Sequence, residues 1–355
     1  MRVMIFAESS QYPNCLHIKG LYQAIQQLGL KGDIYDTCHE PVRDRNIKQA
    51  IQDMTLTRPD LIISCWPHPF EKGPLHDAIK SCHDQGTKVV WWWGDYHKHF
   101  SISIDNDWID RVYMTNYDEM YWRWVSGHVD IPIEQYRYLP EGSYAYPDRK
   151  ALDVSFGHPM LQQKCVSFFG NLSAEVYQPR RDLIEALKKQ RITVMHFEAF
   201  NDEQNRAWLW QPRYWRQAPL MLSMSITNQA PGYTSARLFH MAGSGACILT
   251  ENFPGLEALY NLGSDFERER PEVYAFTSHG QAVEMAEWLL NKSPEFIQEV
   301  GNKAFARTMR DHTITQRVLA ILHDLEIDHE WDSSQINVKA RAFTWPERRG
   351  SAIVR

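Results

Sequence analysis

Hydrophobic and polar positions along this 355-residue chain follow two alternating patterns. Short apolar runs, of which Val3–Ala7 is the first, predict buried strands. Stretches with apolar positions three or four residues apart, such as Leu16–Leu28, predict amphipathic helices between them. Strands that alternate with helices indicate parallel sheets, because a parallel connection needs a crossover. Up to residue 139 the pattern predicts strands at 3–7, 33–35, 61–65, 88–92, 111–115 and 136–139, and helices at 16–28, 46–54, 75–82 and 117–125.

A second series of strands and helices follows a segment without periodicity. Residues 142–163 contain Gly and Pro but no sustained pattern, which is typical of a linker or a long loop. We therefore expect an α/β protein of two doubly wound, Rossmann-like domains, at 1–145 and 164–325, with a linker at 146–163 and a C-terminal tail at 326–355. In the second domain the predicted strands are 166–169, 192–197, 219–226, 246–249 and 273–276, and the predicted helices are 182–189, a short one after Ser235, 279–290, 294–310 and 314–325.

The composition limits the function classes. A net charge of −6 and a pI near 6.2 argue against a protein that binds mainly by neutralising nucleic-acid phosphates. Six cysteines without a CxxC pair indicate buried, reduced thiols, and neither a zinc site nor a disulfide framework. The first apolar run is too short for a signal peptide, and no segment has the length that crosses a bilayer. We expect a cytoplasmic protein with no membrane span.

The stretch Gly232–Leu259 carries the strongest functional signal. Ser235 is placed to cap a helix, the run Gly243–Gly245 ends that helix, and the apolar run Ala246–Leu249 follows as a strand. A helix N-terminus near the carboxyl end of a parallel strand favours anionic ligands, because unpaired N–H groups and the helix dipole both attract negative charge. Arg237, in the first turn of this helix, adds a two-pronged donor suited to a phosphate.

This stretch resembles the sugar-nucleotide signature of GT-B group 1 glycosyltransferases, and within them the CgeB-like, spore-maturation branch. The shared pattern is Arg-x-Phe, small residues, Gly-Ala, an apolar strand and Thr, which begins here at Arg237. The chain departs from it at two positions: His240 stands where the signature has Glu, and Gly232 stands eight positions earlier, without a second Glu. In the family that Glu holds the ribose of the donor, and a His side chain is able to donate or accept a hydrogen bond there.

The resemblance implies further donor-binding residues. The glycine after the first strand of the second domain, Gly170, lets the backbone approach the donor, and Asn171 follows it. A basic residue near the next helix start meets the diphosphate, a role open to Arg180 and Arg181; the alternative is an ordinary surface Arg in a first helical turn. The implied donor set is Gly170, Asn171, Arg180, Arg181, Gly232, Tyr233, Arg237, His240 and Gly245.

A second group of polar residues follows the strand at 88–92. Trp93 to His99, WGDYHKH, is rich in titratable and aromatic side chains at a carboxyl strand end. CgeB-like proteins carry Trp/Phe-x-Asp at a similar position, so Asp95 is the expected residue of the transfer step, with His97 beside it. The alternative is that Asp95 caps the next segment and the histidines lie in solvent. Their spacing is a weak match to a metal site.

The resemblance implies a GT-B fold, in which the two domains face a central cleft and the tail at 326–355 packs back on the N-terminal domain. It also implies a metal-independent glycosyltransferase without a cofactor. The C-terminal domain holds a nucleoside-diphosphate sugar, and the N-terminal domain offers the acceptor: a glycan, a protein, a small molecule or a modified base of a nucleic acid. A retaining enzyme needs no strong base, whereas in an inverting one Asp95 is the natural base. Two alternatives stay open, a sugar-nucleotide epimerase of the same architecture and a non-catalytic nucleotide-sugar-binding protein.

Overall fold

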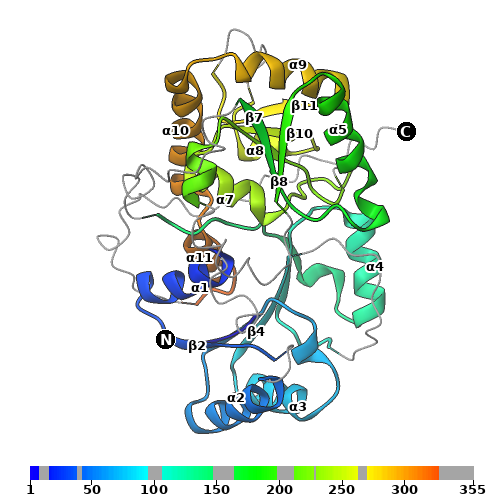
Figure 1. Ribbon diagram of the computed structural model, residues 1–355. Coiled ribbons are helices and arrows are strands. Elements are labelled where there is room, and N and C mark those ends of the chain that lie inside the picture. Colours follow the sequence, from blue (N-terminus) through cyan, green and yellow to red (C-terminus); the bar gives the residue numbers. More distant parts are fainter. Residues whose placement is uncertain are drawn as a thin grey trace.

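The computed structural model describes residues 1–7, 16–37, 42–94, 106–146, 164–197, 212–227, 229–262 and 270–327. Two sheets stand one above the other in Figure 1, each covered by helices. The first has six strands in the order β2-β1-β3-β4-β5-β6, and the second has five in the order β11-β10-β9-β7-β8. Every described strand pair is parallel. The predicted α/β architecture of two doubly wound units is confirmed, and we refer to them as the N-terminal and C-terminal domains.

Both faces of the N-terminal sheet are buried, which explains why its strands are continuous apolar runs. Neighbours in β1 point to opposite faces: Ile5 packs in one core cluster with α1, and Met4 and Phe6 pack in another with α2 and α3. The strands are β1 (Arg2–Phe6), β2 (Lys31–Tyr35), β3 (Leu61–Ser64), β4 (Lys88–Trp93), β5 (Arg111–Met114) and β6 (Tyr136–Tyr138); the helices are α1 (Leu16–Gln27), α2 (Arg43–Thr57), α3 (Pro74–Asp84) and α4 (Glu119–Val129).

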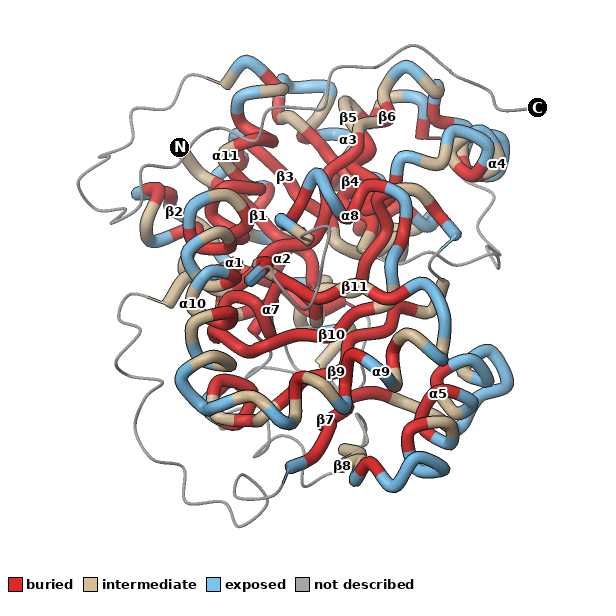
Figure 2. Tube along the Cα trace, turned by 90° about the horizontal axis from the view of Figure 1, so that it is seen from above, coloured by how far each residue is buried: buried red, intermediate tan, exposed pale blue. Residues whose placement is uncertain are grey.

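The C-terminal sheet is enclosed in the same way. Helices α7 and α10 pack on one face, and α5 and α9 pack on the other. Buried residues follow the strands of both sheets in Figure 2, and exposed residues lie on outer helices such as α5. The strands are β7 (Cys165–Phe169), β8 (Thr193–Phe197), β9 (Leu220–Ser223), β10 (Ile248–Glu251) and β11 (Tyr274–Phe276); the helices are α5 (Gln178–Lys189), α7 (Ala236–Ser244), α8 (Leu256–Leu259), α9 (His279–Leu290), α10 (Pro294–Asp311) and α11 (Ile314–Asp324).

Helix α11 packs on the N-terminal domain. Ile314, Val318 and Ile321 belong to the core cluster that contains β1 and α1, so the chain returns to the first domain directly after α10. The sequence pattern assigned this helix to the C-terminal domain and gave the return to the tail. Residues 328–355, which make up most of that tail, lie outside the described residues.

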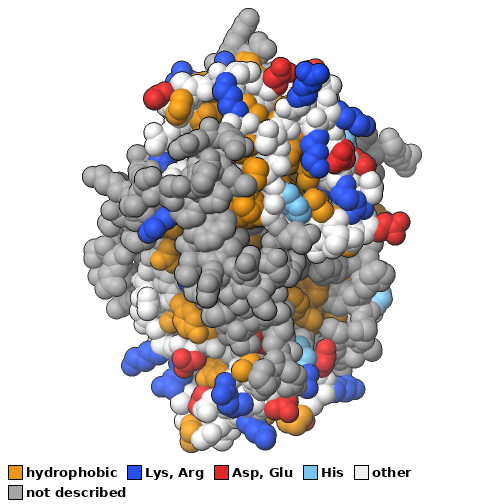
Figure 3. All heavy atoms as spheres, viewed as in Figure 1, with side chains coloured by type: hydrophobic (Ala, Val, Ile, Leu, Met, Phe, Trp, Pro, Cys, Tyr) orange, Lys and Arg blue, Asp and Glu red, His pale blue; other side chains and the backbone are white. Residues whose placement is uncertain are grey.

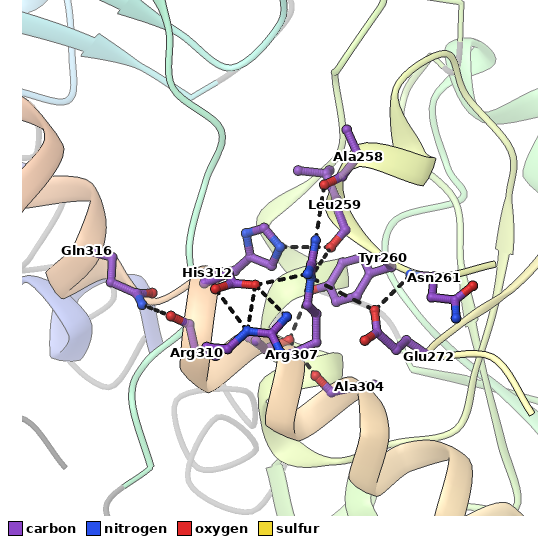
Figure 4. A network of polar contacts seen from close by, with 12 residues as sticks. Ala258, Leu259, Tyr260, Asn261, Glu272, Ala304, Arg307, Arg310, His312 and Gln316 are labelled. Carbon is purple, nitrogen blue, oxygen red and sulfur yellow. Dashed lines mark hydrogen bonds and ion pairs between the residues drawn. The ribbon is translucent and has the colours of Figure 1, made fainter. Parts of the chain in front are cut away.

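The return passes through a buried polar network, shown in Figure 4. His312 donates from Nε2 to the carbonyl of Leu259 at 2.8 Å, and its Nδ1 lies 3.0 Å from Nη2 of Arg317. A guanidinium only donates, so Nδ1 must accept, and burial together with Arg317 holds the pKa of His312 well below 6.5. Arg307 donates to Leu259 at 2.9 Å and pairs with Asp311 at 3.1 Å. The segment from Arg307 to Arg317 therefore joins the two domains.

The carboxyl ends of the two sheets face each other. Tyr117, after β5, donates from its backbone to Pro231 at 2.9 Å and from its hydroxyl to Pro254 at 3.2 Å, and these residues follow β9 and β10. Tyr138 donates to the carbonyl of Gly232 at 3.0 Å. Ligands of open α/β sheets bind at carboxyl strand ends, where the strand order reverses. In these sheets the reversals fall at β1/β3 and at β7/β9.

Candidate functional site

Two guanidinium groups meet at the carboxyl end of the C-terminal sheet. Arg180 lies in the first turn of α5 and Arg237 in the first turn of α7. Both lie over the ring of Phe168, with Cζ atoms 5.8 and 5.5 Å from its centre, and Arg180 also lies 4.3 Å from the ring centre of Tyr177. The aromatic rings hold the two cations together at the strand-order reversal beside β7.

Neither guanidinium has a carboxylate partner among the described residues. Arg180 donates to the carbonyl of Asn171 at 3.1 Å, and Arg237 donates to that of Met224 at 3.2 Å. Arg180 is only 5% exposed, and its Nε has no partner in the described part of the chain. Burial and the charge of Arg180 lower the pKa of Arg237 to about 9, and burial lowers that of Arg180. A bound anion would relieve both the desolvation and the repulsion.

The backbone around the pair also favours an anion. Helices α5 and α7 both begin at this edge, so their positive dipole ends lie near the guanidiniums. A Cβ built on Gly170 would come within 3.2 Å of Nη2 of Arg237 and 3.0 Å of Cζ of Phe168. Asn171 shapes the next turn, since its Oδ1 accepts from the backbone of Ser173 at 2.7 Å. The glycine thus allows the Arg237 guanidinium to lie directly against the chain.

Arg181 has a different role from its neighbour. Its guanidinium donates to the carbonyls of Leu172 and Ala174 and to the side chain of Gln178. Successive helical residues differ by about 100° in direction. The side chain of Arg180 therefore lies in the guanidinium pair, whereas that of Arg181 holds the loop that leads into α5.

Tyr233 joins the guanidinium pair. Its side chain is buried and lies close enough to raise the pKa values of both Arg180 and Arg237, against the larger lowering by burial. The preceding residue, Gly232, faces the N-terminal domain: a Cβ there would come within 2.4 Å of the ring of Tyr117. Gly232 thus packs against the N-terminal domain and anchors the loop that carries Tyr233.

Gly245 also lies apart from the pair. It ends α7 in the left-handed conformation, with φ of +81°, as the sequence predicts for a glycine after a helix. Its carbonyl accepts from Arg216 at 3.0 Å, and a Cβ would come within 2.5 Å of Nη1 of that arginine. Because α7 has nine residues, its two ends are separated by about 13 Å. Gly245 therefore packs against protein at the opposite edge of the sheet.

His240 lies one turn after Arg237, at the contact between the domains. It is 4% exposed, and neither ring nitrogen has a hydrogen-bond partner among the described residues. Burial, and then the charge of His17, lowers the pKa of His240 to about 3. Two unsatisfied nitrogens in a buried ring suit a ligand with neighbouring hydroxyl groups, because a neutral imidazole donates from one nitrogen and accepts at the other.

The two residues predicted for transfer, Asp95 and His97, lie outside the described residues. Gly94, directly before them, follows the last residue of β4 and lies next to Glu141: a Cβ on the glycine would come within 2.5 Å of Oε1. Glu141 in turn lies 3.2 Å from Nδ1 of His17. The sequence pattern did not single out His17 and Glu141. The signal that could have found them is their position, because both residues follow strands of one parallel sheet. Among the described residues, no three His, Cys, Asp or Glu side chains are grouped to hold a metal ion.

Residues 178–323, which contain Arg180, Arg237 and His240, match the family described as glycosyl transferase-like. No protein with a curated description matches the sequence. None of the described helices has both the length and the apolar character that spanning a membrane requires.

Solved structures match over nearly the whole chain. One is an alpha-glucosyltransferase in complex with UDP-glucose and DNA containing an abasic site, with a TM-score of 0.58 and 9% identity over 92% of this chain and 100% of that one. Another, an alpha-glucosyltransferase in complex with UDP, has a TM-score of 0.58 and 10% identity over the same shares of the two chains. The chain therefore has the GT-B fold, and its residues 178–323 match a glycosyl transferase-like family.

Proposed function

We propose that this protein is a glycosyltransferase that moves a sugar from a nucleoside-diphosphate sugar to an acceptor hydroxyl. The observation that carries the proposal is the pair of guanidiniums over Phe168, with Arg180 buried and Arg237 half-buried, which lie beside two helix N-termini and have no carboxylate partner among the described residues. The donor diphosphate would supply the missing negative charge. The glycosyl transferase-like match of residues 178–323 supports the same assignment.

The donor would bind along the edge of the C-terminal sheet. Arg180 and Arg237 hold the diphosphate, Gly170 permits its approach, and Tyr233 closes the side nearest the N-terminal domain. His240 offers its free ring nitrogens to the ribose, in the place of the signature Glu. Arg side chains and helix dipoles stabilise a leaving diphosphate without a metal ion, so we propose metal-independent transfer.

The N-terminal domain would present the acceptor. Asp95 and His97 are the proposed residues of the transfer step, because they follow β4 at the edge that faces the donor domain. On the face in Figure 3, acidic and basic side chains are interspersed over the described surface of both domains. That distribution fits a neutral hydroxyl acceptor better than an extended phosphate backbone. We further propose that the chain belongs to the CgeB-like branch, on the motif that begins at Arg237.

A donor screen tests the function directly. Thermal unfolding would be followed with UDP, GDP, ADP, CDP and dTDP, uridine first because the similar structures hold UDP or UDP-glucose. A ligand at 100 times its Kd stabilises by about 2.7 kcal/mol. The matching sugar nucleotides would then be incubated with EDTA and with glycan, metabolite and hydroxymethylated-DNA acceptors. Transfer or slow donor hydrolysis supports the proposal. Formation of an epimer without an acceptor would show that the protein is an epimerase. Binding without any turnover would show that it is a non-catalytic binding protein.

A further inference from the structure

Tyr117 of the N-terminal domain lies against two loops of the C-terminal domain. Its backbone N–H donates to the carbonyl of Pro231 at 2.9 Å, and its hydroxyl donates to that of Pro254 at 3.2 Å. Pro231 lies in the loop after β9 and Pro254 in the loop after β10. The two loops are also joined to each other, because the amide of Gly232 donates to Pro254 at 2.7 Å. Tyr117 therefore contacts a unit that is already bonded within the C-terminal domain.

Two glycines make room for the Tyr117 side chain. Gly232 and Gly255 both have positive φ, +73° and +98°, which glycine adopts without strain. A Cβ on Gly232 would overlap the ring of Tyr117, and a Cβ on Gly255 would overlap its hydroxyl. Tyr138 packs edge-on against the same ring, with ring centres 5.0 Å apart, and donates to the carbonyl of Gly232 at 3.0 Å. We call Gly232, Pro254 and Gly255 the tyrosine socket.

The N-terminal domain fixes the backbone on both sides of Tyr117. Asn116 is fully buried: its side chain accepts from the amide of Asp118 at 3.0 Å, and its carbonyl accepts from Nε1 of Trp122 at 3.0 Å. Asp118 caps α4, since its Oδ1 accepts from two amides in the first turn of that helix. The position of Tyr117 is therefore determined by β5 and α4, and the socket must fit it.

The socket is continuous with the first turn of α7. Gly232 is followed by Tyr233, whose buried side chain interacts electrostatically with the guanidinium pair. Ser235 caps α7 by accepting from the amide of Arg237 at 3.4 Å, and its own amide donates to Oγ of Ser225 at 3.0 Å. The cap of the helix that carries Arg237 thus stands only a few residues after Gly232, so a displacement of Gly232 would reach Tyr233 and the cap.

We propose that Tyr117 is a positioning residue of the donor site. This inference rests on the proposed function. By holding Gly232 in place, Tyr117 fixes Tyr233 and the start of α7 before a donor arrives, so that the N-terminal domain completes the diphosphate site of the C-terminal domain. Without Tyr117 in the socket, the loop would have to be ordered when the donor binds, and that cost would weaken the affinity.

The first test follows Tyr233 in the protein without ligand. The chain would be labelled with fluorotyrosine, the Tyr233 resonance assigned by its loss in Tyr233→Phe, and its fluorine NMR signal compared among variants. Tyr117→Ala should shift or broaden this resonance, and Tyr117→Phe should leave it near its wild-type position, because the ring still fills the socket. Tyr22→Ala, which removes an exposed tyrosine of α1, is the control and should not change it. An unchanged resonance in Tyr117→Ala would overturn the inference.

The second test measures the affinity for UDP and inorganic pyrophosphate by calorimetry. Tyr117→Ala should weaken the binding of both about 10-fold, which corresponds to ordering about one residue of the loop at binding. Tyr117→Phe and Tyr22→Ala should bind like wild type.

A double-mutant cycle examines the same contact from the other domain. Gly232→Ala should weaken UDP binding less in the Tyr117→Ala background than in the wild-type background. The overlap with the ring is then gone, whereas the backbone strain at position 232 is the same in both backgrounds. Losses of affinity that simply add would contradict the positioning role.

The outcomes separate this inference from the proposed function. If Arg237→Ala weakens UDP binding while Tyr117→Ala binds like wild type, the donor site stands and the role of Tyr117 is refuted, even if Tyr117→Ala is less stable in urea. If neither variant changes the binding of any nucleoside diphosphate, the donor site itself is wrong, and the positioning role is wrong with it. Gly255→Ala keeps the tyrosine but displaces its hydroxyl, so it serves should Tyr117→Ala not fold: it should weaken UDP binding, and unchanged binding would refute the role.

Discussion

Arg237 and Gly170 touch across the carboxyl end of the C-terminal sheet, so that a Cβ on the glycine would come within 3.2 Å of Nη2 of the arginine. A Cβ at that distance would be closer than ordinary van der Waals packing allows. The absence of a side chain at position 170 therefore determines where the Arg237 guanidinium lies, and with it the geometry of the proposed diphosphate site.

Gly170→Ala should displace Arg237 and weaken nucleoside-diphosphate binding about 10-fold, because a charge-assisted contact is worth about 1.5–3 kcal/mol. Gly127 in α4 provides the matched control. A Cβ there meets nothing within 4 Å, so Gly127→Ala should leave binding unchanged and stabilise the helix by about 0.5–1 kcal/mol. Calorimetric affinities and urea unfolding measure both effects. If Gly170→Ala loses stability but binds normally, the glycine has only a packing role.

His240 should make the fold sensitive to acid. Its pKa is about 3 in the folded protein and near 6.5 in the unfolded chain, so the unfolded state binds the extra proton between these values. The free energy of unfolding is therefore unaffected by the titration of this group above pH 6.5. It falls by about 1.4 kcal/mol per pH unit as the pH decreases from 6.5 toward 3. His240→Phe keeps an aromatic ring but cannot titrate. Urea unfolding at pH 7.0, 5.5 and 4.5 should show a shallower acid loss in this variant, and an equal slope would contradict the buried neutral ring.

Asp95→Asn tests the transfer step. Asn keeps the size and hydrogen-bonding capacity of Asp but removes its charge and basicity. If Asp95 serves as a base, turnover should fall about 10²–10⁴-fold with donor affinity unchanged. Turnover and affinity must be measured on the same variant. Near-normal turnover would identify Asp95 as a helix cap, a role that Asn fills equally well, and a selective loss of affinity would assign it to the donor site.

Most of the fold follows from the sequence pattern. Buried parallel strands are short apolar runs, and helices such as α9 and α10 were predicted within one residue of their ends. Ser235 and Gly245 bound α7 as expected, since local capping chemistry determines helix ends. The position of α11 could not be predicted, because an apolar helical face does not indicate which of two sheets it will cover.

The candidate site could be predicted only in part. Arg180 and Arg237 follow from their places in first helical turns beside parallel strands. The different positions of Arg180 and Arg181 depend on the rotation of α5, and the position of Gly245 at the far end of α7 depends on the direction of that helix. His17 and Glu141 are far apart in sequence, and their pairing depends on strand order, which a single sequence does not reveal.

The affinity of Arg237→Ala for a nucleoside diphosphate tests the central claim most directly. Arg213, an exposed arginine, is the control. We predict that Arg237→Ala binds 10- to 150-fold more weakly, a loss of about 1.5–3 kcal/mol, while Arg213→Ala binds normally. Since the free protein partly buries this cation without a described carboxylate partner, Arg237→Ala should unfold at the same urea concentration as wild type or higher. Unchanged affinity together with lost stability would contradict the account, because Arg237 would then serve the fold and not the donor.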